Sequence, residues 1–162
     1  LGVNGAGKST LFLNFNGILK PSSGEVLYKG EKIKYTHSYL NELRKNIGIV
    51  FQDPDNQLFS ANVYQEVSFG AMNLDLDETE VRKRVDEGLK SVNMYEYKDK
   101  AVHFLSYGQK KRVSIADILV MEPEIIIFDE PTSSLDPKHA KQIVEIFNEI
   151  NEAGIKIGRA HV

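Results

Sequence analysis

The chain has 162 residues, which is long enough for one domain with its own hydrophobic core. It is 41% hydrophobic and 27% charged with a formal net charge of -3, a composition that gives no sign of disorder or of a nucleic-acid-binding surface. Its longest apolar runs, such as Ile125 to Phe128, are far shorter than the roughly 20 residues that cross a bilayer. Cysteine is absent, which excludes disulfides and thiolate metal sites and fits a reducing cytosol.

The two ends of the sequence differ from natural termini. The chain opens on Leu1-Gly2 without Met and runs straight into a motif that normally follows a strand, so we expect the natural protein to begin earlier. Near the other end, Ile155 begins an apolar segment that breaks off into Gly-Arg-Ala-His-Val. We expect residues 158–162, or 157–162 at most, to be a non-native tail translated from a sequencing adapter. Sequencing the genomic DNA through this stretch tests the expectation.

The first third of the chain predicts a helix, a hairpin and a strand. Residues 25–28 and 33–35 flank a Lys-Gly turn and predict a β-hairpin. Residues 47–51 form a short apolar run that is typical of a buried strand. Residues 8–20 predict a helix that Pro21 ends, with an apolar face formed by Leu11, Phe15, Ile18 and Leu19.

Two capping boxes mark the helices of the middle of the chain. Ser106 with Gln109 predicts the start of a helix that runs to about Met121. Asp77 with Glu80 predicts the start of another, whose inner face is formed by Val81, Val85, Leu89 and Val92. Residues 61–119 contain no convincing strand, so we interpret them as a helical insert.

The last third predicts one more strand and one more helix. Residues 124–128 form a β-branched, apolar strand that ends on two acids. Asp136 caps the next helix, Pro137 occupies its first turn and Gly154 ends it. Strands separated by helices indicate an α/β fold with a parallel sheet. The inner face of the last helix is predicted to contain Ala140, Ile143, Val144, Phe147 and Ile150.

A phosphate-binding loop opens the chain. Residues 2–9 match the pattern G-x-x-x-x-G-K-[ST], in which backbone N–H groups surround phosphate at a helix N-terminus. Lys8 would neutralise the β and γ phosphates, and the Ser9 hydroxyl would bind Mg²⁺. The alternative is a glycine turn that only caps a helix. The predicted phosphate-binding residues are Asn4, Gly5, Ala6, Gly7, Lys8, Ser9 and Thr10.

Two adjacent carboxylates follow the strand at residues 124–128. They lie where open α/β sheets bind ligands, at the carboxyl end of a strand. Asp129 would hold Mg²⁺ through water, and Glu130 would orient and deprotonate the attacking water as a general base. A buried strand that ends in Asp-Glu is common, so this prediction depends on its combination with the phosphate-binding loop.

The segment Leu-Ser-Tyr-Gly-Gln at residues 105–109, followed by Lys-Lys-Arg, resembles the signature motif of ABC ATPases. The resemblance implies that Ser106, Tyr107, Gly108 and Gln109 contact the γ phosphate of an ATP held by a partner subunit, so that two subunits enclose two ATP molecules. Tyr107 stands where the commonest version of the motif has glycine. By local sequence alone, the segment is equally consistent with an ordinary capped helix.

Two further motifs fit this family in order and spacing. Gln52 resembles the glutamine of the Q-loop, which reaches the magnesium and the water and links them to the membrane subunits. Ser134, Leu135 and Asp136 resemble the D-loop, which lies across the dimer interface. The sequence of residues 51–59 resembles that of the ATPases of energy-coupling factor transporters, including the cobalt importers. In that segment, the apolar residues Leu58 and Phe59 suit either docking to a transmembrane subunit or a place in the core.

The resemblance implies one ABC ATPase domain over residues 1–157. Its P-loop NTPase core, a RecA-like parallel sheet, would comprise residues 1–60 and 120–157, with a helical subdomain at about 61–119. The implied cofactors are ATP and Mg²⁺. The implied partners are a second ATPase subunit, identical or paralogous, a transmembrane energy-coupling subunit and a substrate-binding membrane component. The resemblance further implies a place on the cytoplasmic face of a prokaryotic membrane, with no nucleic acid partner, and uptake of a metal ion, cobalt favoured, or a vitamin.

Other readings remain open at this point. ABC ATPases of DNA repair insert a long coiled coil between Q-loop and signature, whereas Gln52 and Ser106 are only 54 positions apart. Translation-associated ABC proteins are another alternative. The 162-residue polypeptide could also be an inactive nucleotide-binding fragment, and by itself we expect it to be poorly soluble, with negligible ATPase activity. The family's adenine-stacking aromatic residue would precede Leu1, and His161 does not fit the family's switch histidine.

Overall fold

The computed structural model describes residues 6–159 of the chain. Three single turns of 3-10 helix, η1 (Pro54–Asn56), η2 (Tyr95–Tyr97) and η3 (Val102–Phe104), accompany the regular elements. In chain order the helices and strands are α1 (Lys8–Phe15), β1 (Leu27–Tyr28), β2 (Glu31–Lys32), α2 (His37–Asn46), β3 (Ile47–Val50), α3 (Val63–Met72), α4 (Glu78–Ser91), α5 (Tyr107–Leu119), β4 (Ile125–Phe128), α6 (Pro137–Glu152) and β5 (Lys156–Arg159).

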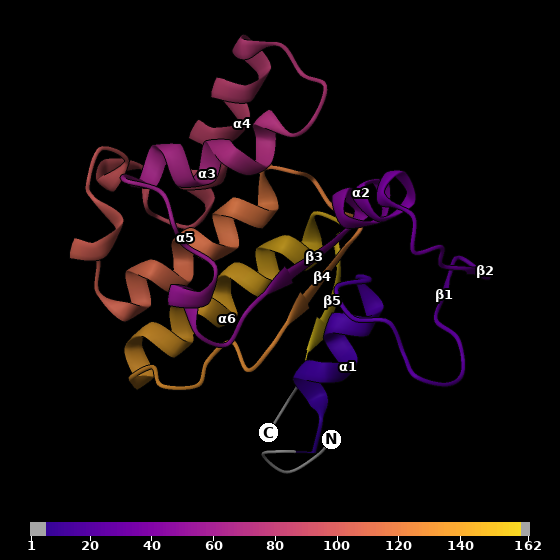
Figure 1. Ribbon diagram of the computed structural model, residues 1–162. Helices are drawn as coiled ribbons and strands as arrows, with labels where there is room; N and C mark the ends of the chain where they lie inside the picture. Colours follow the sequence, from indigo (N-terminus) through magenta and orange to yellow (C-terminus); the bar gives the residue numbers. More distant parts are fainter. Residues whose placement is uncertain (1–5, 160–162) are drawn as a thin grey trace.

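A parallel three-stranded sheet lies at the centre of the fold, with the strand order β3-β4-β5 (Figure 1). Alternate residues of the strands point to opposite faces of the sheet. Val50, Ile126 and Phe128 join the hydrophobic cluster that includes α5 and α6. Ile49 and Ile127 join a second cluster with residues of α1 and α2. The sheet is therefore covered on both faces, and the predicted parallel α/β fold is confirmed.

The helices α3, α4 and α5 pack against one another beside the sheet (Figure 1). Their contact is apolar, since Val67, Val85, Leu89 and Ile115 are all fully buried in the larger cluster. Residues 61–119 contain no strand, only an isolated bridge between Asn62 and Ala101. These residues are thus helical, as predicted. None of the helices within residues 6–159 is long and apolar enough to cross a membrane.

The first helix is shorter than predicted. It ends at Phe15 rather than Lys20, because Gly17 has a φ of 70° and turns the chain away before Pro21 is reached. A side chain at Gly17 would also collide with Leu40. The predicted inner face, made of Leu11, Phe15, Ile18 and Leu19, is partly exposed instead of buried.

Other local predictions need correction. The helix α2 was not predicted, because its hydrophobic residues are few and charged residues dominate its last turn. The second strand of the confirmed hairpin is Glu31–Lys32, ahead of the predicted 33–35.

Two predictions on later helices are also wrong in part. Asp77 caps α4 as predicted, but Glu80 does not complete a capping box and instead binds Arg84, at 2.9 Å. In α6, Val144 was predicted to lie on the inner face but is exposed, and Ile146 is buried instead.

We predict that Gly70→Ala destabilises the fold although alanine favours helices. A Cβ at Gly70 would lie 2.8 Å from the backbone oxygen of Asp117 on α5, which cannot rotate away as a side chain would. We expect the free energy of unfolding to fall by about 1–3 kcal/mol, the usual cost of overpacking. Urea unfolding of the complete subunit measures it. The exposed α3 residue Gln65, changed to Ala, is the control, and equal stabilities of the two variants would contradict the prediction.

Candidate nucleotide-binding site

The carboxyl ends of β3 and β4 bring the predicted motifs together. The register pairs Val50 with Phe128, so the residues that follow the two strands leave the sheet at the same edge. The backbone N–H of Asp129 continues the pairing by donating to the Val50 carbonyl at 3.1 Å. The N-terminal end of α1 lies at this edge as well, since Lys8 and Ser9 both contact the acidic pair.

Lys8 forms an ion pair with Glu130. The Lys8 Nζ lies 2.9 Å from Glu130 Oε1, and the two side chains are only 16% and 12% exposed. Glu130 has a φ of 44°, in the left-handed region that non-glycine residues rarely adopt. Such backbone strain persists where the surrounding structure enforces it, often at functional sites. The lysine of the predicted phosphate-binding loop is thus paired with the second of the two predicted carboxylates.

Ser9 and Asp129 bring a hydroxyl and a carboxylate together. The Ser9 hydroxyl donates to Asp129 Oδ2 at 2.5 Å. Asp129 is buried, and its other oxygen, Oδ1, is enclosed without a hydrogen-bond partner. A buried carboxylate oxygen without a partner is costly unless a cation or water binds it. Residues 6–159 contain no cluster of three or more His, Cys, Asp or Glu side chains that could hold a metal. This donor set suits Mg²⁺, which takes one or two protein oxygens together with phosphates and water.

The remaining phosphate-loop residues lie in two groups. Asn4 and Gly5 fall outside the described residues. Ala6, Gly7 and Thr10 are exposed at the start of α1, where the first backbone N–H groups of a helix have no partner within it. The described part of the loop thus lies at the exposed N-terminal end of α1, beside Lys8.

The signature segment forms the N-terminus of α5. Ser106 and Gln109 make the predicted capping box, since the Ser106 N–H donates to Gln109 Oε1 and the Gln109 N–H donates to the Ser106 hydroxyl, at 3.0 and 3.3 Å. Gly108 is buried against the ring of His139 on α6, where an added Cβ would lie 2.9 Å from the ring. The segment therefore needs glycine at residue 108 for a close packing contact.

The main-chain carbonyl of Gln52, and not its side chain, makes the hydrogen bonds that fix this residue. Its carbonyl accepts hydrogen bonds from the Tyr107 hydroxyl at 3.0 Å and from Lys111 Nζ at 2.6 Å. The Gln52 side chain is exposed and, among the described residues, forms no hydrogen bond with Ser9 or Asp129. The structure thus places Gln52 next to the signature helix and does not bring its amide onto the acidic pair.

The predicted D-loop residues lie between the acidic pair and α6. Ser134 has a φ of 62°, in the left-handed region. Leu135 packs against the larger core cluster. Asp136 caps α6 by accepting from the N–H groups of Lys138 and His139. Its side-chain bond to the His139 ring, together with these backbone bonds, lowers the pKa of the Asp136 carboxyl.

Lys111 is a residue that sequence reasoning missed. It is fully buried, and its Nζ donates to the carbonyls of Phe51 and Gln52 at 2.7 and 2.6 Å. The signal was present in the sequence, because Lys111 lies on the same helical stripe as the buried residues Gly108, Ile115 and Ile118. A charged residue in such a stripe indicates a paired, structural cation.

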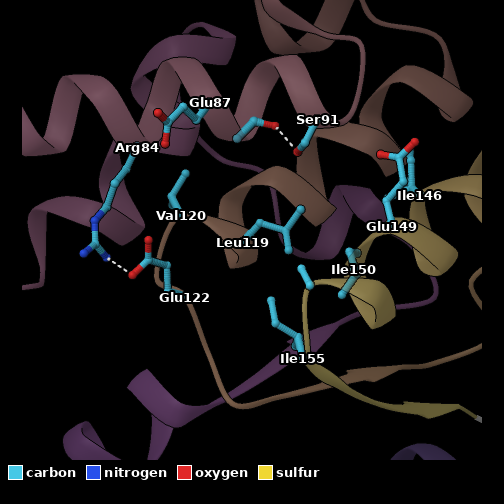
Figure 2. Close-up of a pocket in the computed structure, with 12 residues that line it drawn as sticks. Arg84, Glu87, Ser91, Leu119, Val120, Glu122, Ile146, Glu149, Ile150 and Ile155 are labelled. Atoms are coloured by element: carbon cyan, nitrogen blue, oxygen red, sulfur yellow. Dashed lines mark hydrogen bonds and ion pairs between the residues drawn. The ribbon is translucent and has the colours of Figure 1, made fainter.

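A separate pocket of about 350 Å³ lies between α4, α5 and α6 (Figure 2). Leu119, Ile150 and Ile155 form apolar parts of its wall, and an ion pair between Arg84 and Glu122 at 3.1 Å borders one side. None of the predicted site residues lines it. This pocket is therefore not the nucleotide site, although it is a well-formed hollow.

Known proteins match the chain along most of its length. The ABC transporter family matches residues 1–133. The chain belongs to this family. The energy-coupling factor transporter ATP-binding protein EcfA3 of Clostridium perfringens is 59% identical over 158 residues, covering 97% of this chain and 55% of that relative. EcfA of Methanococcus maripaludis is 58% identical over 157 residues, covering 97% and 56%.

Solved structures of ABC ATPases have the same fold. CbiO1 of Clostridium perfringens, described as part of the ABC transporter complex CbiONQ, has a TM-score of 0.88 and 58% identity, covering 99% of this chain and 64% of that one. An ATP-binding cassette in a dimeric, post-hydrolysis state with ADP and Pi has a TM-score of 0.86 and 30% identity, covering 98% and 71%. The P-loop NTPase fold with its helical insert is thereby confirmed. The chain spans about half the length of the curated relatives it matches.

Asp117 on α5 anchors the segment that follows the Q-loop. Gln57 Nε2 donates to Asp117 Oδ2 at 3.1 Å and to the Ser114 carbonyl at 2.9 Å. Burial is the main cause that raises the pKa of the Asp117 carboxyl to about 7. The hydrogen bond from Gln57 lowers this pKa, and the negative charge of Glu66 raises it further. The folded protein therefore holds a proton at Asp117 between about pH 4 and 7 that the unfolded chain has released.

We predict that Asp117→Asn changes how stability depends on pH. Because the unfolded state binds fewer protons at Asp117, this carboxyl makes the free energy of unfolding fall as pH rises from about 4 to 7. The variant should therefore gain stability relative to wild type at about pH 8 compared with about pH 5. Urea unfolding of the complete subunit at both pH values measures it, with the exposed Asp75→Asn as the control for charge loss. Parallel pH profiles of wild type and variant would refute the prediction.

Proposed function

We propose that this chain is the ATP-binding and ATP-hydrolysing part of an ABC importer subunit of the energy-coupling factor type. The observation that carries the proposal is the pair of contacts Lys8–Glu130 and Ser9–Asp129, which bring a phosphate-binding lysine and a metal-binding hydroxyl onto two carboxylates at one sheet edge. The identity of 59% to an energy-coupling factor transporter ATP-binding protein supports the transporter type.

The chain's own residues would divide the reaction between binding and proton transfer. The N–H groups at the start of α1 and the Lys8 ammonium bind the β and γ phosphates. An arriving γ phosphate competes with Glu130 for Lys8, which frees the carboxylate for water. Glu130 then accepts a proton from the water that attacks the γ phosphorus, and the bond to the ADP oxygen breaks. Gln52 would orient the same water when the loop carries its side chain inward.

The donor set at Ser9 and Asp129 supports a magnesium site. The unpartnered Oδ1 of Asp129 and the Ser9 hydroxyl are the oxygen ligands that would hold Mg²⁺ directly or through water. Bound Mg²⁺ would supply charge neutralisation for the phosphates. Gln52 is proposed as a further ligand from its position at the end of β3.

A second ATPase subunit would complete the site. Ser106, Tyr107, Gly108 and Gln109 lie at the N-terminal end of α5, where Ser106 is exposed, and would meet the γ phosphate held by the partner. The D-loop, residues 134–136, would lie between the two subunits. The solved dimer of a 30% identical cassette is consistent with this assembly. We retain the proposed division into a core of residues 1–60 and 120–157 and a helical subdomain at 61–119.

An apolar patch beside the Q-loop segment would dock the transmembrane subunit. Phe59, Phe69 and Met72 are 69%, 52% and 70% exposed, and the rings of Phe59 and Phe69 pack edge to face at 5.1 Å. The backbone N–H of Phe59 is fixed by buried Glu66 at 2.9 Å. Leu58, in contrast, packs against the core, so of the two roles open for this pair, Phe59 has the docking role. Exposed clusters of this kind mark interaction sites.

The remaining assignments follow from the same type of transporter. The subunit would lie on the cytoplasmic face of a prokaryotic membrane, together with a transmembrane energy-coupling subunit and a substrate-binding component. The cargo would be a transition metal ion or a vitamin, with cobalt favoured, since the structural neighbour CbiO1 belongs to the CbiONQ complex.

We predict that Glu130→Gln stops hydrolysis but leaves ATP binding. Glutamine keeps the size of the side chain but cannot accept the proton of the attacking water, so kcat should fall by about 100-fold or more. Release of phosphate by the complete subunit measures turnover, and a fluorescent ATP analogue measures binding. Glu145→Gln, an exposed change on α6, is the control. Full turnover by Glu130→Gln would sink the proposed role, and absence of turnover in wild type would sink the proposed activity.

We predict that Phe69→Ser with Met72→Ser weakens assembly with the membrane subunits. The changes remove exposed apolar area that would be buried in the complex. We expect the co-purified amount of transmembrane subunit to fall by at least about tenfold. Phe104→Ser, at a residue of η3 that is 70% exposed, is the control. Undiminished co-purification of the double variant would rule out this patch as the docking surface.

A further inference from the structure

The Tyr107 hydroxyl joins two of the predicted motifs. It belongs to the first residue of the signature helix α5, and it donates to the Gln52 carbonyl of the Q-loop at 3.0 Å. Glycine, the commonest residue of the signature motif at this place, has no atom that could make this contact. The tyrosine thus adds a connection within one subunit.

Lys111 reinforces this connection from the next turn of the helix. Positions four apart lie on the same helix face, so Lys111 reaches the same carbonyl of Gln52, at 2.6 Å, and that of Phe51, at 2.7 Å. The lysine is fully buried. Burial lowers the pKa of its ammonium to about 8, while the charges of Asp129 and Asp53 counteract this. Lys111 is therefore a desolvated cation, placed near the aspartate of the proposed magnesium site.

The far end of the Q-loop is fixed to the same helix. Gln57 Oε1 accepts the Phe51 N–H at 3.4 Å, and its Nε2 donates to the Ser114 carbonyl on α5. Lys111 and the Gln57 side chain thus link the backbone of Phe51 and Gln52 to one face of α5. Because these bonds go to main-chain atoms, they set the direction in which the Gln52 side chain leaves the backbone.

We propose that Tyr107 and Lys111 are positioning residues that hold the Q-loop backbone against the signature helix. They thereby set the direction in which the Gln52 side chain points relative to the acidic pair. A shift of α5, such as one caused by a phosphate bound at its N-terminus, is passed to Gln52 through two donors on a single carbonyl. This inference rests on the proposed ATPase function, since it concerns the water and metal site of that reaction.

The test begins with Tyr107→Phe, which removes one hydroxyl and keeps the ring. In the complete subunit without nucleotide, hydrogen–deuterium exchange of residues 52–58 should become about fivefold faster, the change expected for one lost hydrogen bond. The kcat for ATP should fall by a similar factor, and by more than any change in KM, because Lys8 and the start of α1 are unaltered. The control is Tyr95→Phe, whose hydroxyl accepts from Lys98 at 3.3 Å within the helical insert.

A double variant separates positioning from general damage. In a Gln52→Ala background, Tyr107→Phe should lower kcat by less than twofold, because the residue through which it acts is gone. Lys111→Met should accelerate the same exchange by about tenfold or more, and Lys98→Met is its control. Unchanged exchange in Tyr107→Phe, or a full fivefold loss of kcat in the Gln52→Ala background, would overturn the proposal. If wild type hydrolyses no ATP, the proposed function fails. The exchange results alone then decide whether Tyr107 and Lys111 hold the Q-loop backbone.

Discussion

The parallel pairing of β3 with β4 is the constraint on which the site depends. The register places Val50 opposite Phe128, and one further hydrogen bond, from the Asp129 N–H to the Val50 carbonyl, fixes where the chain leaves the sheet. A shift by one residue would turn the buried isoleucines of both strands to the wrong faces. The two hydrophobic clusters on the opposite faces therefore hold the acidic pair and the Q-loop at a common edge.

Two lysines lie beside the acidic pair that the sheet positions. One cation, Lys8, faces Glu130 from the phosphate loop, and another, Lys111, lies under the Q-loop with Asp129 nearby. Both cations are shielded from water, so their interactions with anions are stronger than at the surface. Each of the two carboxylates consequently has a lysine nearby, Lys8 for Glu130 and Lys111 for Asp129.

Sequence patterns predicted the sheet, the helix caps at Asp77, Ser106 and Asp136, and the meeting of Lys8 and Ser9 with the acidic pair, because each follows from local rules of strands and helix ends. They failed where tertiary contacts decide. A left-handed glycine ended α1 early. The helical stripe of α5 indicates that Lys111 is buried and paired. It does not identify the partners of Lys111 and Tyr107 or the direction of Gln52, because these depend on how α5 docks against a distant loop.

The packing of Gly108 on His139 has a consequence for variation of the signature surface. The exposed end of α5 rests on a ring that belongs to α6, and that ring is held in turn by Asp136. A substitution at His139 would therefore reshape the N-terminal end of α5 without altering any residue of the signature segment. Functional differences between related subunits with identical motifs can arise beneath the motif, in the layer that supports it.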